Sequence, residues 1–356
     1  MESSPDNLRG AMNAFRFIIH ALSVITAEVL GLPNILGTVD LWPYLLSIGA
    51  IPAITMILLS RRFPESSKHY YVKTQNTNET VKLIKFFQGE DADVAAIVHE
   101  YEDERTMTQE QGTTTLKEIW SVKWMRIPFM LSIFANIAQN LGGIDVIYNY
   151  SSTLFADMGL DDIESKIATI LTIIPGVVGA VIATGLVEKS GRRPILFSGL
   201  FLAILGCFVI FVAEHFTDFS KIAQYAEILG ACLIIFSFYF SLGPIPEFIF
   251  AELVPEQAHA IVGSLSLTMN WSTTFTITCT FETLHNYMGP YVQWLYIIPT
   301  IAITVYCWSR LPETKGKPVE QIIDIFKEKY GSKLNNNELD NLSSNDYLAN
   351  NNYGAT

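Results

Sequence analysis

Long apolar runs alternate with short polar stretches along most of this 356-residue chain. About eight of the runs reach the length that an α-helix needs to cross a bilayer. They cover residues 10–32, 42–60, 126–150, 166–187, 194–213, 226–250, 260–283 and 291–308. In the seventh run Asn270, Ser272 and a row of threonines dilute the apolar pattern. We expect this polar face to turn inward, because lipid offers such groups no partners. The pattern predicts an all-α, multi-pass membrane protein.

In two further parts of the chain apolar residues recur at helical spacing, but no apolar run there is long enough to cross a membrane. Between residues 61 and 124, apolar side chains recur at helical spacing among charges, which predicts short amphipathic helices on the cytoplasmic face. They are Val81, Ile84, Phe86, Phe87, Val94, Ile97, Val98 and Tyr101. Near the end, Pro318 can open a helix with one apolar stripe. The stripe contains Val319, Ile322, Ile323 and Phe326. Residues 331–356 are rich in asparagine and are predicted to be disordered.

The sixth run is interrupted near its middle by Gly243, Pro244 and Pro246. Each proline lacks a backbone donor and crowds the carbonyl four residues earlier. In hydrocarbon, a freed carbonyl is tolerated only where protein or a water-filled cavity satisfies it. A broken span that ends in an acid, here Glu247, is typical of the binding-site helix of a transporter. The alternative is a simple proline kink in a packed helix.

Polar groups also gather in the third run, where Gln139, Asn140 and Asp145 flank two adjacent glycines. Glycines loosen a helix, and carboxamides donate and accept hydrogen bonds at once, which suits a neutral solute rich in hydroxyls. The alternative is that the amides hold neighbouring helices together. A charged Asp145 would need a partner such as Arg16 or His20 and would otherwise be protonated.

The first run carries Asn13, Arg16, His20 and Ser23 at three- and four-residue steps. These residues therefore share one helix face. Arg16 and His20 are costly to expose to lipid, and we expect them to face the bundle or a water-filled cavity. For Arg16 the alternative is a side chain that reaches the cytoplasmic headgroups.

Composition agrees with a membrane protein, since 50% of the residues are hydrophobic, 16% are charged and the mean hydropathy is +0.30. The net charge of -12 comes from carboxylates outside the apolar runs, and no basic face predicts nucleic-acid binding. The four cysteines lie inside apolar runs without metal-like or redox-like spacing. No nucleophile arrangement and no phosphate-binding glycine loop is found. We therefore expect no catalytic residues, no cofactor, no metal and no ATP-driven pump.

Lysine and arginine are concentrated in alternate loops, and such an excess marks the cytoplasmic side of a membrane. The residues are Arg61, Arg62, Lys68 and Lys73, then Lys189, Arg192 and Arg193, and finally Arg310, Lys315 and Lys317. Both chain ends are therefore expected in the cytoplasm, and we expect the membrane to be the plasma membrane.

Several motifs occur together in a fixed order. They are Pro64-Glu65-Ser66, Gln139-Asn140-Leu141-Gly142-Gly143-Ile144-Asp145, Glu188-Lys189-Ser190-Gly191-Arg192-Arg193-Pro194, Gly243-Pro244-Ile245-Pro246 with Ala251-Glu252-Leu253, Asn270-Trp271, and Pro312-Glu313-Thr314-Lys315-Gly316. By these motifs the chain resembles the facilitative glucose transporters, the sugar porters of the major facilitator superfamily. The resemblance extends to about residue 329.

Members of that family have twelve membrane helices in two halves, and residues 2–11 resemble the loop after the fourth. The resemblance therefore implies a major facilitator fold that lacks its first four helices. Residues 1–60 would supply the last two helices of the amino-terminal half, and residues 61–124 a cytoplasmic helical loop. Residues 125–310 would form the six-helix carboxy-terminal half, and residues 311–330 a cytoplasmic helix.

The resemblance, together with the polar runs, gives a set of expected substrate-binding residues: Phe17, His20, Gln139, Asn140, Asp145, Tyr239, Glu247, Asn270 and Trp271. Gln139 matches the family pattern outright, whereas other positions depart from it. Gly176 stands where the family has asparagine, Tyr239 where it has glutamate, and Glu247 where it has tryptophan. A carboxylate thus replaces an aromatic ring that would stack on a sugar.

The resemblance also implies a cytoplasmic gate, in which charged residues pair across the two halves when the inner side is closed. The gate residues are Arg9, Glu65, Glu188, Arg192, Arg193 and Glu252. Exposed ion pairs of this kind contribute only about 0–1 kcal/mol each, so such a gate remains reversible.

The expected function is facilitated transport of a hexose or related polyol across a lipid bilayer by alternating access, and we expect the chain by itself not to transport. One alternative is a non-transporting protein that associates with full-length family members. Another is a proton-coupled sugar symporter that uses Asp145 or Glu247.

Overall fold

The computed structural model describes residues 6–90, 92–111, 114–157, 159–216 and 221–331, so the tail predicted to be disordered lies outside the described residues. All regular structure among these residues is helical. The elements are α1 (Asp6–Leu30), α2 (Trp42–Ile48), α3 (Ala50–Ser60), α4 (Ser67–Thr74), α5 (Thr77–Gln88), α6 (Val94–Gln111), α7 (Leu116–Ser121), α8 (Lys123–Leu141), α9 (Ile144–Asp157), α10 (Asp162–Ser190), α11 (Arg192–Phe216), α12 (Lys221–Ser237), η2 (Phe238–Leu242), α13 (Pro244–Leu253), α14 (Glu256–Met288), η3 (Gly289–Gln293), α15 (Trp294–Arg310) and α16 (Val319–Tyr330).

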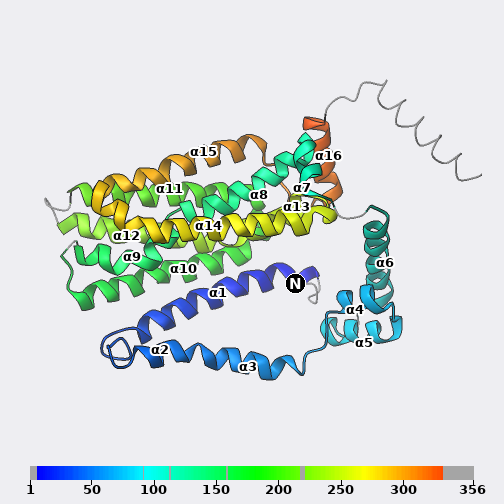
Figure 1. Cartoon of the computed structure of the whole chain (residues 1–356), viewed down its shortest axis with the longest axis horizontal. Helices are drawn as coiled ribbons and strands as arrows, with labels where there is room; N and C mark the ends of the chain where they lie inside the picture. The colour runs from blue at the N-terminus through cyan, green and yellow to red at the C-terminus, as the bar shows by residue number, and fades with distance from the viewer. Residues whose placement is uncertain (1–5, 91, 112–113, 158, 217–220, 332–356) are drawn as a thin grey trace, which may run out of the picture.

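Six stretches of the described residues are long and apolar enough to cross a membrane. They are Trp42–Ser60, Lys123–Ala156, Asp162–Val187, Arg192–Phe216, Ile222–Leu253 and Glu256–Arg310. The last stretch contains two helices, α14 and α15, joined by η3. These stretches account for seven of the eight predicted spans. The first, residues 10–32, overlaps α1, whose side chains are described only from Phe15 onward, and its crossing of a membrane stays a prediction. Helices α8 to α15 form the bundle seen in Figure 1.

The third predicted span is divided into two helices at its glycines. Helix α8 ends at Leu141 and α9 begins at Ile144. Between them Gly143 has a φ of 91°, which other residues rarely adopt, and a Cβ there would lie 3.1 Å from the Sγ of Cys207. The carbonyl of Leu141 accepts a hydrogen bond from Thr300 at 3.3 Å, and the Gly142 carbonyl faces the Cys207 thiol at 3.7 Å. The break is therefore closed by side chains of neighbouring helices, as membrane burial requires.

The sixth predicted span is interrupted as well. After α12 the chain forms a π-helix, η2, in which the N–H of Gly243 donates to the carbonyl of Phe238 at 2.7 Å. A new helix, α13, then begins at Pro244, in the first turn, where a missing N–H costs nothing. The carbonyl of Pro246 accepts a hydrogen bond from Asn136 on α8 at 2.9 Å. The span is thus a helix that stops and restarts rather than a simple kink.

The two interruptions pack against each other. A Cβ added at Gly142 would lie 3.1 Å from a methyl group of Leu242 in η2 and 3.3 Å from Ala203 on α11. The hydroxyl of Ser241 in η2 donates to the carbonyl of Ile195 on α11 at 2.8 Å. The middle of the bundle therefore holds two segments that are not α-helical, side by side.

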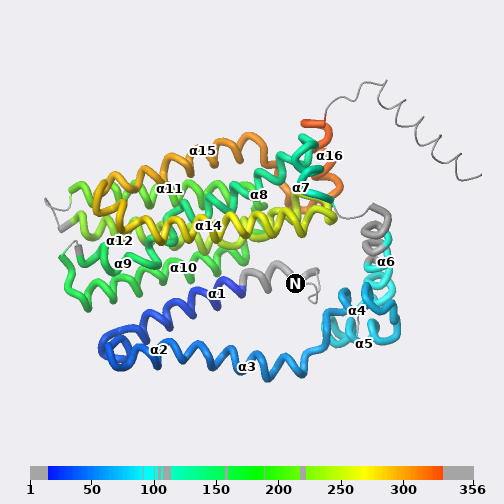
Figure 2. The backbone as a smooth tube through the Cα atoms, viewed as in Figure 1, coloured from blue at the N-terminus to red at the C-terminus, as the bar shows by residue number. Residues whose placement is uncertain are grey.

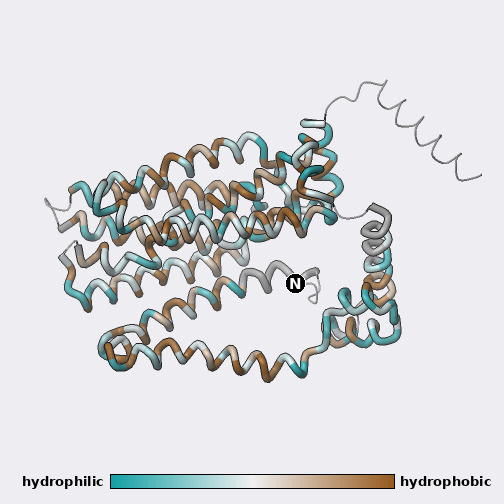
Figure 3. The backbone as a smooth tube through the Cα atoms, viewed as in Figure 1, coloured by the Kyte–Doolittle hydropathy of each residue, from teal (hydrophilic) through white to brown (hydrophobic). Residues whose placement is uncertain are grey.

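The first two spans differ in how many of their residues are buried against the bundle. Helix α1 lies along α10 and buries Phe17 and Ala21. In contrast, α2 and α3 bury no residue, although their sequence is strongly apolar. Figure 2 shows the chain reversing direction after α1 and continuing through α2 and α3 towards α4. In Figure 3 the tube of α3 is largely brown, for hydrophobic residues, and lies apart from the helices of the bundle.

The short helices predicted for residues 61–124 and after Pro318 are present. Helices α4, α5 and α6 bury Tyr71, Ile84 and Tyr101 in a small core of their own. They connect to the bundle through an ion pair of 3.4 Å between Lys68 on α4 and Glu256, the first residue of α14. Helix α16 begins after Pro318, as expected, and buries Ile322 and Phe326 from the predicted stripe.

Candidate functional site

The carboxamides of the third span lie buried between three helices. The Nδ2 atom of Asn270 on α14 donates to Oε1 of Gln139 at 2.8 Å, and Nδ2 of Asn140 donates to the carbonyl of Asn270 at 2.7 Å. Asn136, one turn earlier on α8, donates to Pro246 on α13. In this conformation the amides hold α8, α13 and α14 together, which is the alternative that the sequence left open.

Asn136 is a part of this cluster that we did not predict from the sequence. It precedes Gln139 and Asn140 by three and four residues, so it shares their helix face. That periodicity was the signal that could have identified it. Because carboxamides both donate and accept, the same cluster can exchange its internal bonds for bonds to hydroxyl groups.

Asp145 lies in the first turn of α9 and is buried. The hydroxyl of Thr274 on α14 is its hydrogen-bonding neighbour, whereas Oδ2 has no partner among the described residues. Neither of the expected partners reaches it, because Arg16 pairs with Glu247 and His20 contacts Tyr239. Of the two alternatives given for Asp145, an ion pair with Arg16 or His20 is thus not formed in this conformation.

Tyr239 is completely buried, and its hydroxyl joins three helices. It accepts a hydrogen bond from Tyr148 on α9 at 2.8 Å and lies 3.1 Å from Nδ1 of His20 on α1. Its ring occupies the space above Gly176 on α10, where an added Cβ would lie 2.5 Å from the Cδ2 atom of Tyr239. The two departures from the family pattern, a tyrosine and a glycine, therefore compensate each other in volume. Tyr148 was not predicted from the sequence.

Arg16 and Glu247 form an ion pair between α1 and the first turn of α13. Phe17, the next residue on α1, is buried against the ring of Phe238, with ring centroids 6.3 Å apart. These contacts answer the question that the sequence left open for Arg16. Its guanidinium engages the carboxy-terminal half rather than the headgroups.

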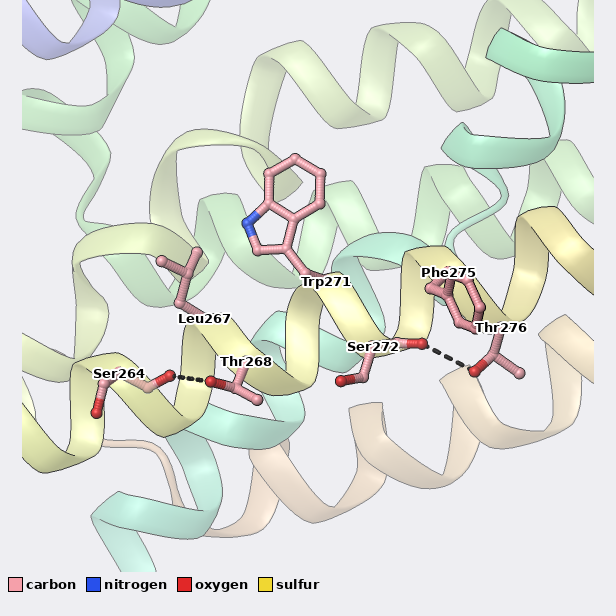
Figure 4. Close-up of a pocket in the computed structure, with 7 residues that line it drawn as sticks. All are labelled: Ser264, Leu267, Thr268, Trp271, Ser272, Phe275 and Thr276. Atoms are coloured by element: carbon pink, nitrogen blue, oxygen red, sulfur yellow. Dashed lines mark hydrogen bonds between the residues drawn. The ribbon is translucent and has the colours of Figure 1, made fainter.

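Asn270 and Trp271 are adjacent in sequence but face different surroundings. Asn270 is buried in the amide cluster, whereas 64% of Trp271 is exposed. Figure 4 shows the Trp271 indole projecting from α14 on the same side as Leu267. An open groove of about 660 Å³ runs along this side and is lined by Ser264, Leu267, Thr268, Trp271, Ser272, Phe275 and Thr276. Trp271 therefore lies at an open surface, whereas its neighbour Asn270 belongs to the buried carboxamide cluster.

The charges predicted to form a cytoplasmic gate lie in a network at one end of the bundle. Nε of Arg192 lies 3.1 Å from Oε1 of Glu252, whose other oxygen accepts a hydrogen bond from Thr314. Glu313 accepts from the backbone N–H groups of Arg192 at 2.9 Å and Arg193 at 3.2 Å, at the start of α11. A carboxylate is favoured there by the partial positive charge of a helix N-terminus.

This network lies within the carboxy-terminal half, whereas the resemblance implied pairing across the halves. Arg193 donates to the carbonyl of Trp308 at 2.9 Å, so it too is engaged inside that half. Glu65 is exposed. The side chains of Arg9 and Glu188 lie outside the described residues, so their predicted pairing stays a prediction. Glu313 is a network member that we did not predict as part of the gate, although its motif was noted.

An all-helical bundle in which two interrupted membrane helices meet, with buried polar groups at the interruptions, defines a multi-pass membrane protein of the transporter type. The family model described as "Sugar (and other) transporter" matches residues 1–326. The chain belongs to this family.

Curated relatives and solved structures agree with this assignment. Facilitated glucose transporter member 4 of solute carrier family 2, from Homo sapiens, is 28% identical over 326 residues, which cover 91% of this chain and 63% of the relative. Member 2 from Mus musculus is 28% identical and is likewise covered over 63% of its length. The chain thus spans less than two thirds of these relatives.

Two solved structures of the bacterial transporter XylE show the major facilitator fold. The proton:xylose symporter XylE bound to 6-bromo-6-deoxy-D-glucose has a TM-score of 0.73 at 19% identity, over 91% of this chain and 69% of that chain. The inward-open conformation of XylE from E. coli has a TM-score of 0.66 at 21% identity, over 91% of this chain and 67% of that chain. The predicted fold class is therefore confirmed.

We predict that Gly176→Ala destabilises the protein, because its Cβ would collide with Tyr239, and overpacking of this kind costs about 1–3 kcal/mol. The loss is measured as a lower thermal midpoint in detergent, with a thiol-reactive dye that reports exposure of the buried Cys207 and Cys307. Gly185→Ala on the same helix is the matched control, since a Cβ there meets nothing within 4 Å. The loss should shrink when Tyr239 is already alanine. Equal midpoints for the two glycine variants would contradict the packing argument.

We also predict that Glu313→Gln lowers the same midpoint, because hydrogen bonds to a charged group contribute about 1.5–3 kcal/mol and the charge at the α11 N-terminus is lost. The exposed Glu65→Gln serves as the control and should change the free energy of unfolding by less than about 0.5 kcal/mol. A Glu313 variant as stable as the Glu65 variant would show that the network does not hold this end of the bundle.

Proposed function

We propose that this chain serves facilitated transport of a small neutral sugar, a hexose or a related polyol, by alternating access. The observation that supports the proposal most strongly is the meeting of two interrupted helices at the carboxamide cluster. In transporters, discontinuous helices carry the substrate site near the middle of the membrane. Family membership and the printed names of the relatives, which are facilitated glucose transporters, agree with this substrate class.

The carboxamides supply the chemistry that the proposal needs. Each sugar hydroxyl both donates and accepts a hydrogen bond, and so do the side chains of Gln139, Asn140 and Asn270. In this conformation the cluster satisfies itself. A solute would therefore replace internal hydrogen bonds by bonds of equal kind, so the net change in binding free energy is at most about 1 kcal/mol per bond. Such small differences suit a site that must release its solute on either side.

For the orientation, we propose that both chain ends lie in the cytoplasm and that the membrane is the plasma membrane. The basic loops support the first part. Lys315 donates to the carbonyl of Lys189 at 2.6 Å, so two of these loops lie at the same end of the bundle. Lys68 reaches Glu256 at that end as well. An excess of lysine and arginine in short loops marks the cytoplasmic side.

Coupling to protons would need an acid that gains and loses a proton inside the membrane. Of the two acids considered, Asp145 fits better than Glu247. One oxygen of Asp145 has no partner among the described residues, whereas Glu247 is paired with Arg16. The proposal of a symporter would therefore rest on Asp145.

Sugar binding tests the main proposal. We expect the purified chain in lipid nanodiscs to bind labelled D-glucose or D-xylose saturably, and Gln139→Leu to weaken that binding about 5-fold or more, because one hydrogen bond of about 1 kcal/mol is lost. Gln88→Leu on the cytoplasmic helix α5 is the control and should bind like the parent chain. Absence of saturable binding, or equal binding by both variants, would refute the proposed site.

A second candidate function, association with a full-length family member, is favoured by two uncovered helix surfaces. The span Trp42–Ser60 buries none of its residues. On α14, the exposed Leu267, Trp271 and Phe275 are spaced four residues apart and alternate with small hydroxyl residues. Small residues at this spacing let membrane helices approach closely. We propose that helices of a full-length relative cover the α14 surface.

Co-purification from membranes tests the association. We expect the chain to be captured by a tagged full-length facilitated glucose transporter, and Trp271→Ala to reduce the captured amount several-fold. Phe201→Ala is a matched control, because Phe201 is as exposed as Trp271 but lies on α11. Failure to co-purify, or equal capture of both variants, would argue against this function.

A further inference from the structure

Three residues of α1 contact the interrupted sixth span within one helical turn. Arg16 pairs with Glu247 in α13, Phe17 contacts Gly243 and Phe238, and His20 lies 3.1 Å from the hydroxyl of Tyr239 in η2. Every one of these contacts falls on the segment between residues 238 and 247. The connection is therefore specific to the part of the span that is not a continuous α-helix.

Close packing fixes the distance between α1 and this segment. A Cβ added at Gly243 would lie 2.5 Å from the ring of Phe17, so the backbone at the break touches the α1 side chain directly. Gly243 is also the residue whose N–H closes the π-turn to Phe238. A shift of α1 towards the break is blocked by this contact. A shift away from it would have to separate the charges of Arg16 and Glu247.

Groups at the interruption stabilise the charges of Arg16 and Glu247. Glu247 sits in the first turn of α13, where the partial positive charge of the helix end favours a carboxylate. Arg16 also lies 4.7 Å from the ring centroid of Phe17, which steadies the guanidinium by a cation–π contact. Within a membrane span, an arginine or glutamate that loses its partner is costly. Breaking the ion pair would therefore leave both charges without a partner at the interruption.

We propose that the Arg16–Glu247 ion pair is a latch that positions the interrupted span against α1 and so joins the two parts of the chain. Both residues are positioning residues in this assignment. The latch acts through charge and is independent of any solute. The exposed fractions of the two side chains, 55% and 37%, leave the pair open to solvent on one side, so it can be broken and remade without unfolding the bundle.

A double-mutant cycle without sugar tests the latch. Thermal midpoints of the chain in nanodiscs are compared for Arg16→Gln, Glu247→Gln and the double variant. We expect each single variant to lose about 3 °C or more, and the double variant to lose clearly less than the sum, because the second change removes a charge that is already unpaired. The exchanged pair, Arg16→Glu with Glu247→Arg, should regain part of the loss. Additive losses without recovery would overturn the proposal.

The pair Lys68–Glu256 provides the matched control for the cycle. Its nitrogen and oxygen lie 3.4 Å apart at the cytoplasmic end, where exposed pairs contribute little. We expect the corresponding glutamine variants to be additive. A coupling there as large as that between Arg16 and Glu247 would show that the cycle reports general charge effects and would remove the support for a latch.

Disulfide trapping tests the same contact if the neutral variants fold poorly. We expect Arg16→Cys with Glu247→Cys to cross-link under mild oxidation in native membranes, with the joined peptides identified by mass spectrometry. Phe15→Cys with Glu247→Cys is the control, since Phe15 is exposed one position away on α1. Cross-linking of the control pair but not of the Arg16 pair would overturn the proposed contact.

Discussion

Backbone hydrogen bonds at the two helix interruptions are the constraint on which the centre of this molecule depends. Inside a bilayer, a peptide group released from a helix must find a partner within the protein. Thr300 donates to the carbonyl of Leu141 at the end of α8, Asn136 donates to the carbonyl of Pro246 in the first turn of α13, and the π-turn closes on Phe238. Side chains of α8 and α15 take part in these bonds. The interruptions are therefore stable local structures, around which polar side chains can be concentrated.

The same region explains how an altered ligand shell is compatible with the family fold. Tyr239 fills the volume that Gly176 leaves free, and Glu247 finds its countercharge in Arg16. Each unusual residue is thus matched by a second one on a neighbouring helix. Core packing tolerates such changes when volume and charge are preserved together. The scaffold is retained, while the groups that a solute would meet at these positions differ from those of the family pattern.

The end of the bundle that carries Arg192, Glu252 and Glu313 is held by partly exposed charges rather than by buried polar groups. Its charges are partly exposed, and they are organised around Glu313, which binds the first N–H groups of α11. Lys315 and Arg193 add hydrogen bonds to carbonyls of Lys189 and Trp308. The network therefore joins helices of the carboxy-terminal half to one another. Helix α4 contacts the same end of the bundle through the ion pair of Lys68 and Glu256.

The sequence by itself determined the long apolar spans, the amphipathic stripe of α16 and the interruption of the sixth span, because apolar length, helical period and proline placement act locally. The division of the third span into α8 and α9 was not predicted, although its adjacent glycines were noted. It also identified Gln139, Asn140, Asn270 and Glu247 as unusual polar groups. Their partners were decided only by the tertiary structure. Whether Arg16 neutralises Asp145 or Glu247, and whether Trp271 faces the same side as Asn270, depends on how α1, α13 and α14 rotate and pack. Helical period assigns residues to a face, but only the packing of the helices decides what that face meets.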